Sequence, residues 1–201
     1  MATRVDHEQR RRQIAVALLQ IAATRGLQAA SMREVAAEAG VSLRLVQYYF
    51  SAKEQLLLGS LPYLGERLTA RVQARLADLG SPPSPRQVLE GVLLAVLPTD
   101  EESRAIRRTY DAFYALVRTD PGLAERNSAG DPDALERLLA RQVTSAQEAG
   151  EVAADQDAGL VAAGLLSLTN GLGASVIGGQ RDGEAASTVL RYHLDRLFSG
   201  R

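Results

Sequence analysis

Apolar residues recur every three or four positions along almost the whole chain, and this helical period constrains the fold more than any other feature of the sequence. Between Glu8 and Arg25, for example, Ile14, Leu18 and Ile21 form one helical face. Alternating runs of β-branched residues, which are typical of strands, are absent, and aromatic residues make up only 4% of the chain. The pattern therefore predicts an all-α protein of about nine helices.

Capping residues and helix breakers set the expected helix bounds. Ser31 and Glu34 form a capping-box pattern that begins a short helix, Gly40 ends it, and Ser42 caps a second short helix that runs to about Tyr49. The later helices are expected over residues 53–79, 85–97, 100–118, 133–149, 157–178 and 184–198, with a linker at 80–85 and a loop over 119–133.

A proline inside the first long helix conflicts with this pattern. Pro62 lies in the middle of the helix that is expected over residues 53–79. Because proline removes a backbone donor and its ring crowds the preceding turn, the sequence predicts a kink or a break near residue 61.

Charge divides the chain unevenly. Residues 1–55 carry eight basic and five acidic side chains, whereas residues 56–201 carry fifteen basic and nineteen acidic ones. A basic head on an acidic body is typical of a protein whose head binds a polyanion, although an imbalance of this size also fits a solvated face. We therefore expect one domain over residues 1–55 and a larger helical domain over residues 56–201.

The composition excludes several kinds of catalytic and metal site. The chain has no cysteine, which excludes disulfides, thiol catalysis and cysteine-based metal sites. With His7 and His193 as its only histidines it cannot form a multi-histidine centre, and it has no nucleophile elbow, phosphate-binding loop or dinucleotide fingerprint. We expect a protein that is not an enzyme and binds no cofactor or metal. The polar first thirty residues lack a secretory pattern, which indicates a cytoplasmic location.

The stretch from Ser31 to Lys53 carries the functional prediction. Two short helices joined by the turn at residues 40–42 have the spacing of a helix-turn-helix. Val46 and Phe50 face inward on the second helix, so the opposite strip presents an apolar group, a cation, an amide and a phenol: Leu43, Arg44, Gln47 and Tyr48. This set fits a recognition helix in a DNA major groove, where arginine pairs with guanine and glutamine with adenine. A solvated helix face is the alternative interpretation.

Four short motifs within residues 10–57 point to a known family. They are Gly26–Leu27, Ser31–Ala36, Ala39–Ser42 and Tyr48–Leu56. In these motifs the chain resembles the TetR family of transcriptional regulators, and its run Val46–Phe50 is most similar to the branch that includes the betaine-pathway regulators. The resemblance implies a helix-turn-helix DNA-binding domain over residues 1–55 and a ligand-binding and dimerisation domain over residues 56–201. It also implies a sequence-specific regulator, commonly a repressor that a small molecule releases from its operator.

The resemblance implies DNA contacts at nine positions. Ser31 and Arg33 would contact phosphate, and Tyr49 would lie near the DNA backbone. Lys53 would anchor a phosphate at the N-terminus of the long helix, where the backbone amides add partial positive charge. Five side chains would face the DNA groove: Ser42, Leu43, Arg44, Gln47 and Tyr48. The family often has a small residue in place of Arg44 and a tyrosine in place of Gln47, so these positions leave the operator sequence open.

Two further sets of side chains have open interpretations. Four arginines near the N-terminus either reach the DNA backbone or minor groove or form a solvated tail: Arg4, Arg10, Arg11 and Arg12. Tyr110, Phe113 and Tyr114 either line the pocket that the resemblance implies, which would take an apolar or aromatic effector, or fill the core. Possible polar groups of that pocket are Arg107, Arg108 and Gln142.

The last two expected helices have the composition of a dimer interface. The segment 158–180 is uncharged and long enough to span a bilayer, but its six glycines and several polar residues favour a buried helix instead. Gly164, Gly171 and Ala174 would allow a close helix–helix approach, and the final helix is more apolar than a single core contact requires. We therefore expect a homodimer that pairs two helices from each chain and reads a pseudo-palindromic double-stranded operator, with His193 packed at or near the interface.

Overall fold

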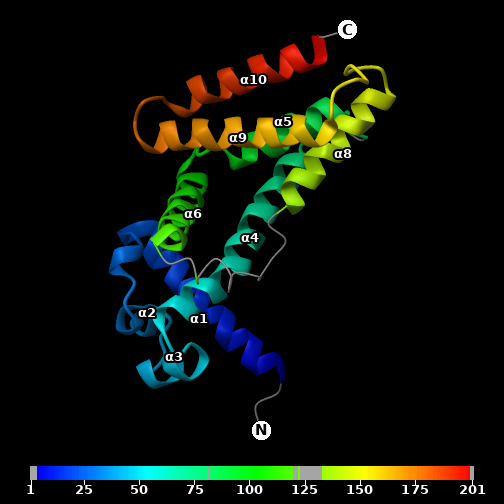
Figure 1. The fold of residues 1–201 in the computed structure, drawn as a ribbon. Coiled ribbons are helices and arrows are strands. Elements are labelled where there is room, and N and C mark those ends of the chain that lie inside the picture. The colour runs from blue at the N-terminus through cyan, green and yellow to red at the C-terminus, as the bar shows by residue number, and fades with distance from the viewer. Residues whose placement is uncertain (1–3, 81, 120–121, 123–132, 200–201) are drawn as a thin grey trace. The chain divides into compact units, whose positions relative to one another are not determined.

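The computed structural model describes residues 4–80, 82–119, 122 and 133–199. These residues form nine α-helices and one short 3-10 helix and contain no strand, which confirms the all-α prediction (Figure 1). The helices are α1 (Arg4–Arg25), η1 (Leu27–Ala29), α2 (Met32–Glu38), α3 (Leu43–Tyr49), α4 (Lys53–Ala77), α5 (Pro85–Val96), α6 (Glu101–Thr119), α8 (Ala134–Glu148), α9 (Ala158–Ile177) and α10 (Gly183–Ser199). Most of the expected loop over 119–133 lies outside the described residues.

Short polar side chains begin the two small helices as the sequence predicts. The Ser31 hydroxyl oxygen accepts a hydrogen bond from the Glu34 amide at 3.1 Å, and Ser42 does the same for the Leu45 amide at 3.2 Å. The Glu34 carboxylate accepts a hydrogen bond from Arg25 at 3.1 Å. Only one of the two hydrogen bonds of the capping box predicted at Ser31 is therefore formed. A complete capping box begins α5 instead, between Ser84 and Gln87.

Pro62 does not break its helix. α4 is a continuous helix of 25 residues that includes Pro62, so a break near residue 61 is wrong, and the alternative of a kink stays a prediction. The proline removes a single backbone donor, whereas Leu57, Tyr63 and Leu64 on both sides of it are buried in one core. Burial of this much apolar surface outweighs the loss of one exposed hydrogen bond.

The chain packs as two compact units. The first contains residues 1–67 and 105–130, and the second contains residues 68–104 and 131–201. α4 and α6 therefore each contribute residues to both units. The functional division that the sequence suggests at residue 55 is a different one, and it stays a prediction.

The first unit buries the face that the periodicity of α1 predicts. Ile14, Leu18 and Ile21 have almost no exposed surface, and α1 contacts α2 and η1. Val46 and Phe50 enter the same core from the end of α3, which in turn packs on α2. The opposite side of α3 is thereby directed away from the core.

The second unit is a bundle of α5, α8, α9 and α10. α9 contacts the other three helices, and Figure 1 shows it running alongside α10. α9 is the one described helix whose length and hydropathy would suit a membrane span. Its buried side chains, such as Ala162, Leu165 and Leu172, pack in the core of this bundle. Only 39% of its most apolar stretch is buried, however, so the expected burial on most of its surface is wrong for a single chain.

Candidate nucleic-acid interface

The outward side of α3 presents three polar or aromatic side chains. Arg44, Gln47 and Tyr48 are exposed, and Tyr48 has 70% of its surface accessible. Val46 and Phe50 are buried, so the face assignment from the sequence is confirmed for these five residues.

Leu43 lies differently from the other members of the predicted strip. It is half-buried and packs against the core of the first unit. Only part of its side chain remains available for a thymine methyl group. Arg44, Gln47 and Tyr48 therefore have more exposed surface available for DNA than Leu43 has.

Ser31 and Ser42 combine a structural contact with a free donor. Each hydroxyl oxygen caps its helix by accepting one backbone amide, and both side chains remain exposed. A hydroxyl has one donor and two acceptor positions, so capping leaves the O–H group able to donate to a phosphate oxygen. The two caps thus place hydroxyl donors at the N-termini of α2 and α3.

The predicted DNA-contacting cations are Arg33, Arg44 and Lys53. Arg33 and Arg44 are exposed and Lys53 is half-buried at the first position of α4. Within the described part of the chain, none of the three forms a salt bridge, whereas Arg25 on the same unit pairs with both Glu34 and Glu38. Unpaired cations near helix N-termini favour binding of an anion.

The N-terminal arginines are part of a helix, not of a tail. α1 begins at Arg4, and Arg10 donates to Gln13 at 2.9 Å. Arg11 lies over the Phe50 ring at 5.1 Å, while Arg12 bonds to Glu66 at 2.7 Å and lies over the Tyr63 ring at 5.4 Å. The solvated-tail alternative is wrong for Arg11 and Arg12, because these side chains are engaged with α4 and with the residue that follows α3, whereas their contact with DNA stays a prediction. The Arg4 side chain lies outside the described residues.

Close packing fixes the start of α4 against the end of α3. A Cβ atom added to Gly59 would lie 2.6 Å from Cε1 of Phe50, so glycine is required for this approach. One turn later, the Tyr63 hydroxyl donates to Glu8 Oε1 at 2.7 Å. Burial, and then the Glu8 carboxylate, raise the pKa of Tyr63 to about 12, so the hydroxyl keeps its proton. The part of α4 that follows Lys53 is thus held against Phe50 and α1.

The predicted effector residues form one cluster on α6. The rings of Tyr110 and Tyr114 stack with centroids 6.4 Å apart, and Phe113 meets Tyr114 edge-on at 6.0 Å. Phe113 is buried, Tyr110 packs against the core of the first unit, and Tyr114 is 58% exposed. Burial, and then the neighbouring Tyr114, raise the pKa of Tyr110.

The polar groups proposed for the same pocket come from both compact units. Arg107 pairs with Asp111 at 2.9 Å along α6, and Arg108 is exposed. Gln142 belongs to the second unit, on α8. A role of these three residues in ligand binding stays a prediction.

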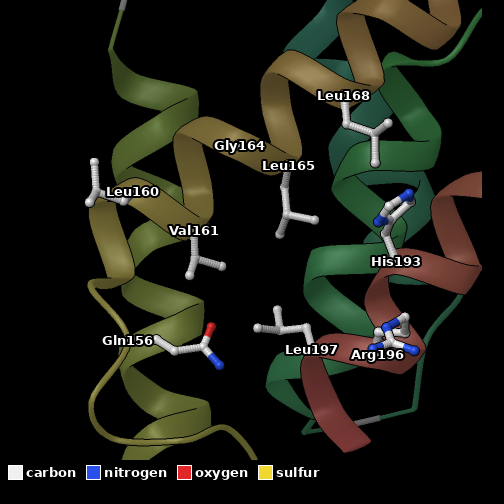
Figure 2. Close-up of a pocket in the computed structure, with 9 residues that line it drawn as sticks. All are labelled: Gln156, Leu160, Val161, Gly164, Leu165, Leu168, His193, Arg196 and Leu197. Atoms are coloured by element: carbon white, nitrogen blue, oxygen red, sulfur yellow. The ribbon is translucent and has the colours of Figure 1, made fainter. Parts of the chain in front are cut away.

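Two open hollows occur on the described surface. One, of about 480 Å³, lies along α1 and α2 and includes Gln13 and Glu38. The other, of about 460 Å³, lies between α9 and α10. Figure 2 shows Leu165 and Leu197 pointing into this second hollow, with His193 and Arg196 on α10 beside them.

Comparison with known proteins assigns both parts of the chain to one family. Residues 14–59 match the model of bacterial regulatory proteins of the tetR family, and residues 85–199 match the C-terminal model of the BetI-type transcriptional repressor. The chain belongs to the TetR family. This confirms the resemblance seen in the sequence, including its betaine-regulator branch, and establishes a DNA-binding transcriptional regulator of the BetI type, not an enzyme.

Individual relatives of the chain are transcriptional regulators as well. The HTH-type transcriptional regulator PksA of Bacillus subtilis is 32% identical over 141 residues, which cover 70% of this chain and 67% of that protein. BetI of Serratia proteamaculans is 29% identical over 165 residues, or 81% of this chain and 78% of BetI. A solved transcriptional regulator from Rhodococcus sp. superposes with a TM-score of 0.76 at 29% identity, covering 94% of this chain and 96% of that one.

One residue near the helix-turn-helix was missed by sequence reasoning. The Nδ1 atom of His7 lies 3.1 Å from the Tyr49 hydroxyl, so α1 contacts the predicted DNA-facing tyrosines. No motif links positions 42 residues apart, and only the fold brings the first turn of α1 to the end of α3.

Proposed function

We propose that this TetR-family protein represses transcription by binding a pseudo-palindromic operator as a homodimer, and that a small apolar or aromatic molecule releases it. The observation that carries the proposal is the outward side of α3, where Arg44, Gln47 and Tyr48 are exposed and no salt bridge of the described residues involves Arg44. A repressor of chromosomal genes works where the DNA is, so the proposed location is the cytoplasm.

On the operator, the nine predicted residues divide into two roles. Arg44 and Gln47 read base edges in the major groove, with Ser42, Leu43 and Tyr48 beside them. Ser31, Arg33, Tyr49 and Lys53 position the head on the phosphate backbone, which carries no sequence information of its own. The free hydroxyl donors and unpaired cations described above support this division.

The α9–α10 surface supports the proposed homodimer. Small or apolar residues at alternating intervals of four and three form an exposed stripe on α9: Leu160, Gly164, Ser167, Gly171 and Ala174. A Cβ atom added to Gly164 or Gly171 would meet nothing within 4 Å, so the stripe is open to a second helix. Together with the hollow beside Leu165, this surface suits α9 and α10 of a second copy in a four-helix bundle.

The aromatic cluster on α6 supports the proposed effector response. α6 contributes to both compact units, and so does α4, which begins at the predicted anchor Lys53. A ligand that favours an arrangement unable to bind operator must itself bind less tightly when operator is present, and by the same factor. A coupling of about 1–3 kcal/mol is ordinary for such a system.

Substitutions in the cluster are expected to reduce the ligand response while leaving operator affinity nearly unchanged. Effector candidates are first found by thermal-shift screening of small apolar and aromatic compounds, and each is then titrated into preformed operator complexes. Tyr114→Ala is the main variant, since its exposed ring can be removed without a cavity, and Phe113→Ala is compared after circular dichroism confirms its fold. An unchanged ligand response in both variants would show that the cluster does not line the effector pocket.

A further inference from the structure

Three rings from two helices meet at the end of α3. The His7 ring on α1 lies 5.7 Å from the Tyr49 ring and 6.3 Å from the Tyr48 ring, measured between centroids. The two tyrosine rings are 5.2 Å apart and almost perpendicular. The Tyr49 hydroxyl is also within hydrogen-bond distance of His7 Nδ1. His7 therefore contacts both tyrosines that are predicted to face DNA.

Two neighbouring rows of side chains on α1 make contacts of this kind. His7 and Arg11, one turn apart, contact the end of α3 through Tyr49 and Phe50. Glu8 and Arg12, the next row, contact α4 through Tyr63 and Glu66. Residues four apart share a helix face, so α1 holds α3 with one row and α4 with the other.

The row that contains His7 contacts Tyr48, whose ring is largely exposed, and Tyr49, whose ring packs partly against the core of the first unit. Tyr48 is the most exposed aromatic side chain in the described structure, with 70% of its surface accessible, and α3 has only seven residues. An exposed side chain of this size moves freely between rotamers unless a neighbour restricts it, and that freedom is lost when it is buried against a ligand. The perpendicular Tyr49 ring restricts Tyr48, and His7 in turn restricts Tyr49.

We propose that His7 is a positioning residue for operator binding: through its Nδ1 bond to Tyr49 and its ring contact with Tyr48 it holds both tyrosines in their DNA-binding orientation before DNA arrives. The inference rests on the proposed use of α3 as the recognition helix. His7 acts through the tyrosines and contributes no phosphate contact of its own. Replacing His7 is therefore expected to lower operator affinity and to leave unchanged the number of DNA phosphates that the protein neutralises.

The experiment measures operator affinity and its salt dependence for a set of His7 variants. His7→Ala removes both interactions and is expected to weaken binding about five- to thirtyfold. His7→Asn keeps a hydrogen-bonding group near the Nδ1 position, and His7→Phe keeps the ring, so each is expected to recover part of the loss. The slope of log affinity against log salt is expected to stay at the wild-type value in all three.

A double-mutant cycle tests whether His7 acts through Tyr49. Tyr49→Phe removes the hydroxyl, so in that background His7→Phe is expected to cost less than twofold, because the bond it removes is already absent. Gln9→Ala, an exposed change two positions along α1, is the control for an effect on the helix itself. Circular dichroism and melting curves show whether each variant is folded.

Each outcome bears on either the inference or the proposed function. If Arg44→Ala and Lys53→Ala impair binding but His7→Ala binds within twofold of wild type, the positioning role is wrong and α3 remains the recognition helix. If the loss in His7→Phe persists undiminished in the Tyr49→Phe background and the salt slope falls, His7 contacts phosphate directly and the inference is also wrong. If Arg44→Ala and Lys53→Ala bind as well as wild type, the proposed function fails, and the inference fails with it.

Discussion

Leu160→Glu is expected to convert the protein to monomers and to weaken operator binding at least about 100-fold. Leu160 lies on the exposed stripe of α9 with 74% of its surface accessible, so the substitution leaves the fold of one chain intact. In the proposed dimer the stripe is covered, and an unpaired carboxylate buried in an interface costs about 3 kcal/mol or more, which corresponds to a factor of at least about 100. A monomer also loses the additional affinity that a dimer gains when its two linked DNA-binding domains bind one operator.

The measurement is sedimentation equilibrium beside operator titration, with Thr144→Glu as the matched control. Thr144 is exposed on α8, a helix that contributes no residue to the stripe, and the substitution adds the same charge. The control is expected to remain dimeric and to bind the operator. If Leu160→Glu is still a dimer of wild-type affinity, the α9 stripe is not the interface.

Arg44→Ala and Gln47→Ala are expected to cost about 1–3 kcal/mol each and to relax the preference at particular base pairs. Lys53→Ala is expected to weaken binding to all sequences alike and to lower the salt slope by about one unit. The difference follows from their places in the structure: Arg44 and Gln47 are on the outward side of α3, whereas Lys53 begins α4.

Binding-site selection on each variant separates these two roles. Arg67→Ala is a suitable control, because Arg67 is an exposed cation of the same unit and is not among the predicted DNA contacts. If the site selected by Arg44→Ala matches the wild-type site at every position, the Arg44 side chain contacts phosphate and the reading strip is smaller than proposed.

Local signals in the sequence were sufficient to predict most of the fold. The periodicity of α1 identifies the residues it buries, and the serines before α2 and α3 cap these helices as expected. These features depend on residues within one or two turns, which is the range over which helix patterns are informative. The inward and outward sides of α3 follow from the same period.

The features that sequence reasoning missed depend on packing between helices. The Pro62 break was expected from local chemistry, but the core around Tyr63 and Leu64 keeps α4 continuous. The roles of Arg12 and His7 depend on partners far away in the chain, at Glu66 and Tyr49, and no pattern in the sequence marks those pairs. Leu43 was placed on the outward strip by its spacing, but its side chain leans toward the core.

The most direct test of DNA recognition by a dimer is a salt titration of the wild-type protein on its own selected operator. Genomic fragments retained by the purified protein give the site, and fluorescence anisotropy with sedimentation gives affinity and stoichiometry at several salt concentrations. We predict a pseudo-palindromic site with two chains bound, and a log–log slope of about −5 or steeper if about six phosphates are neutralised. Affinity that does not change with salt, or one chain on an asymmetric site, would contradict the proposed mode of binding.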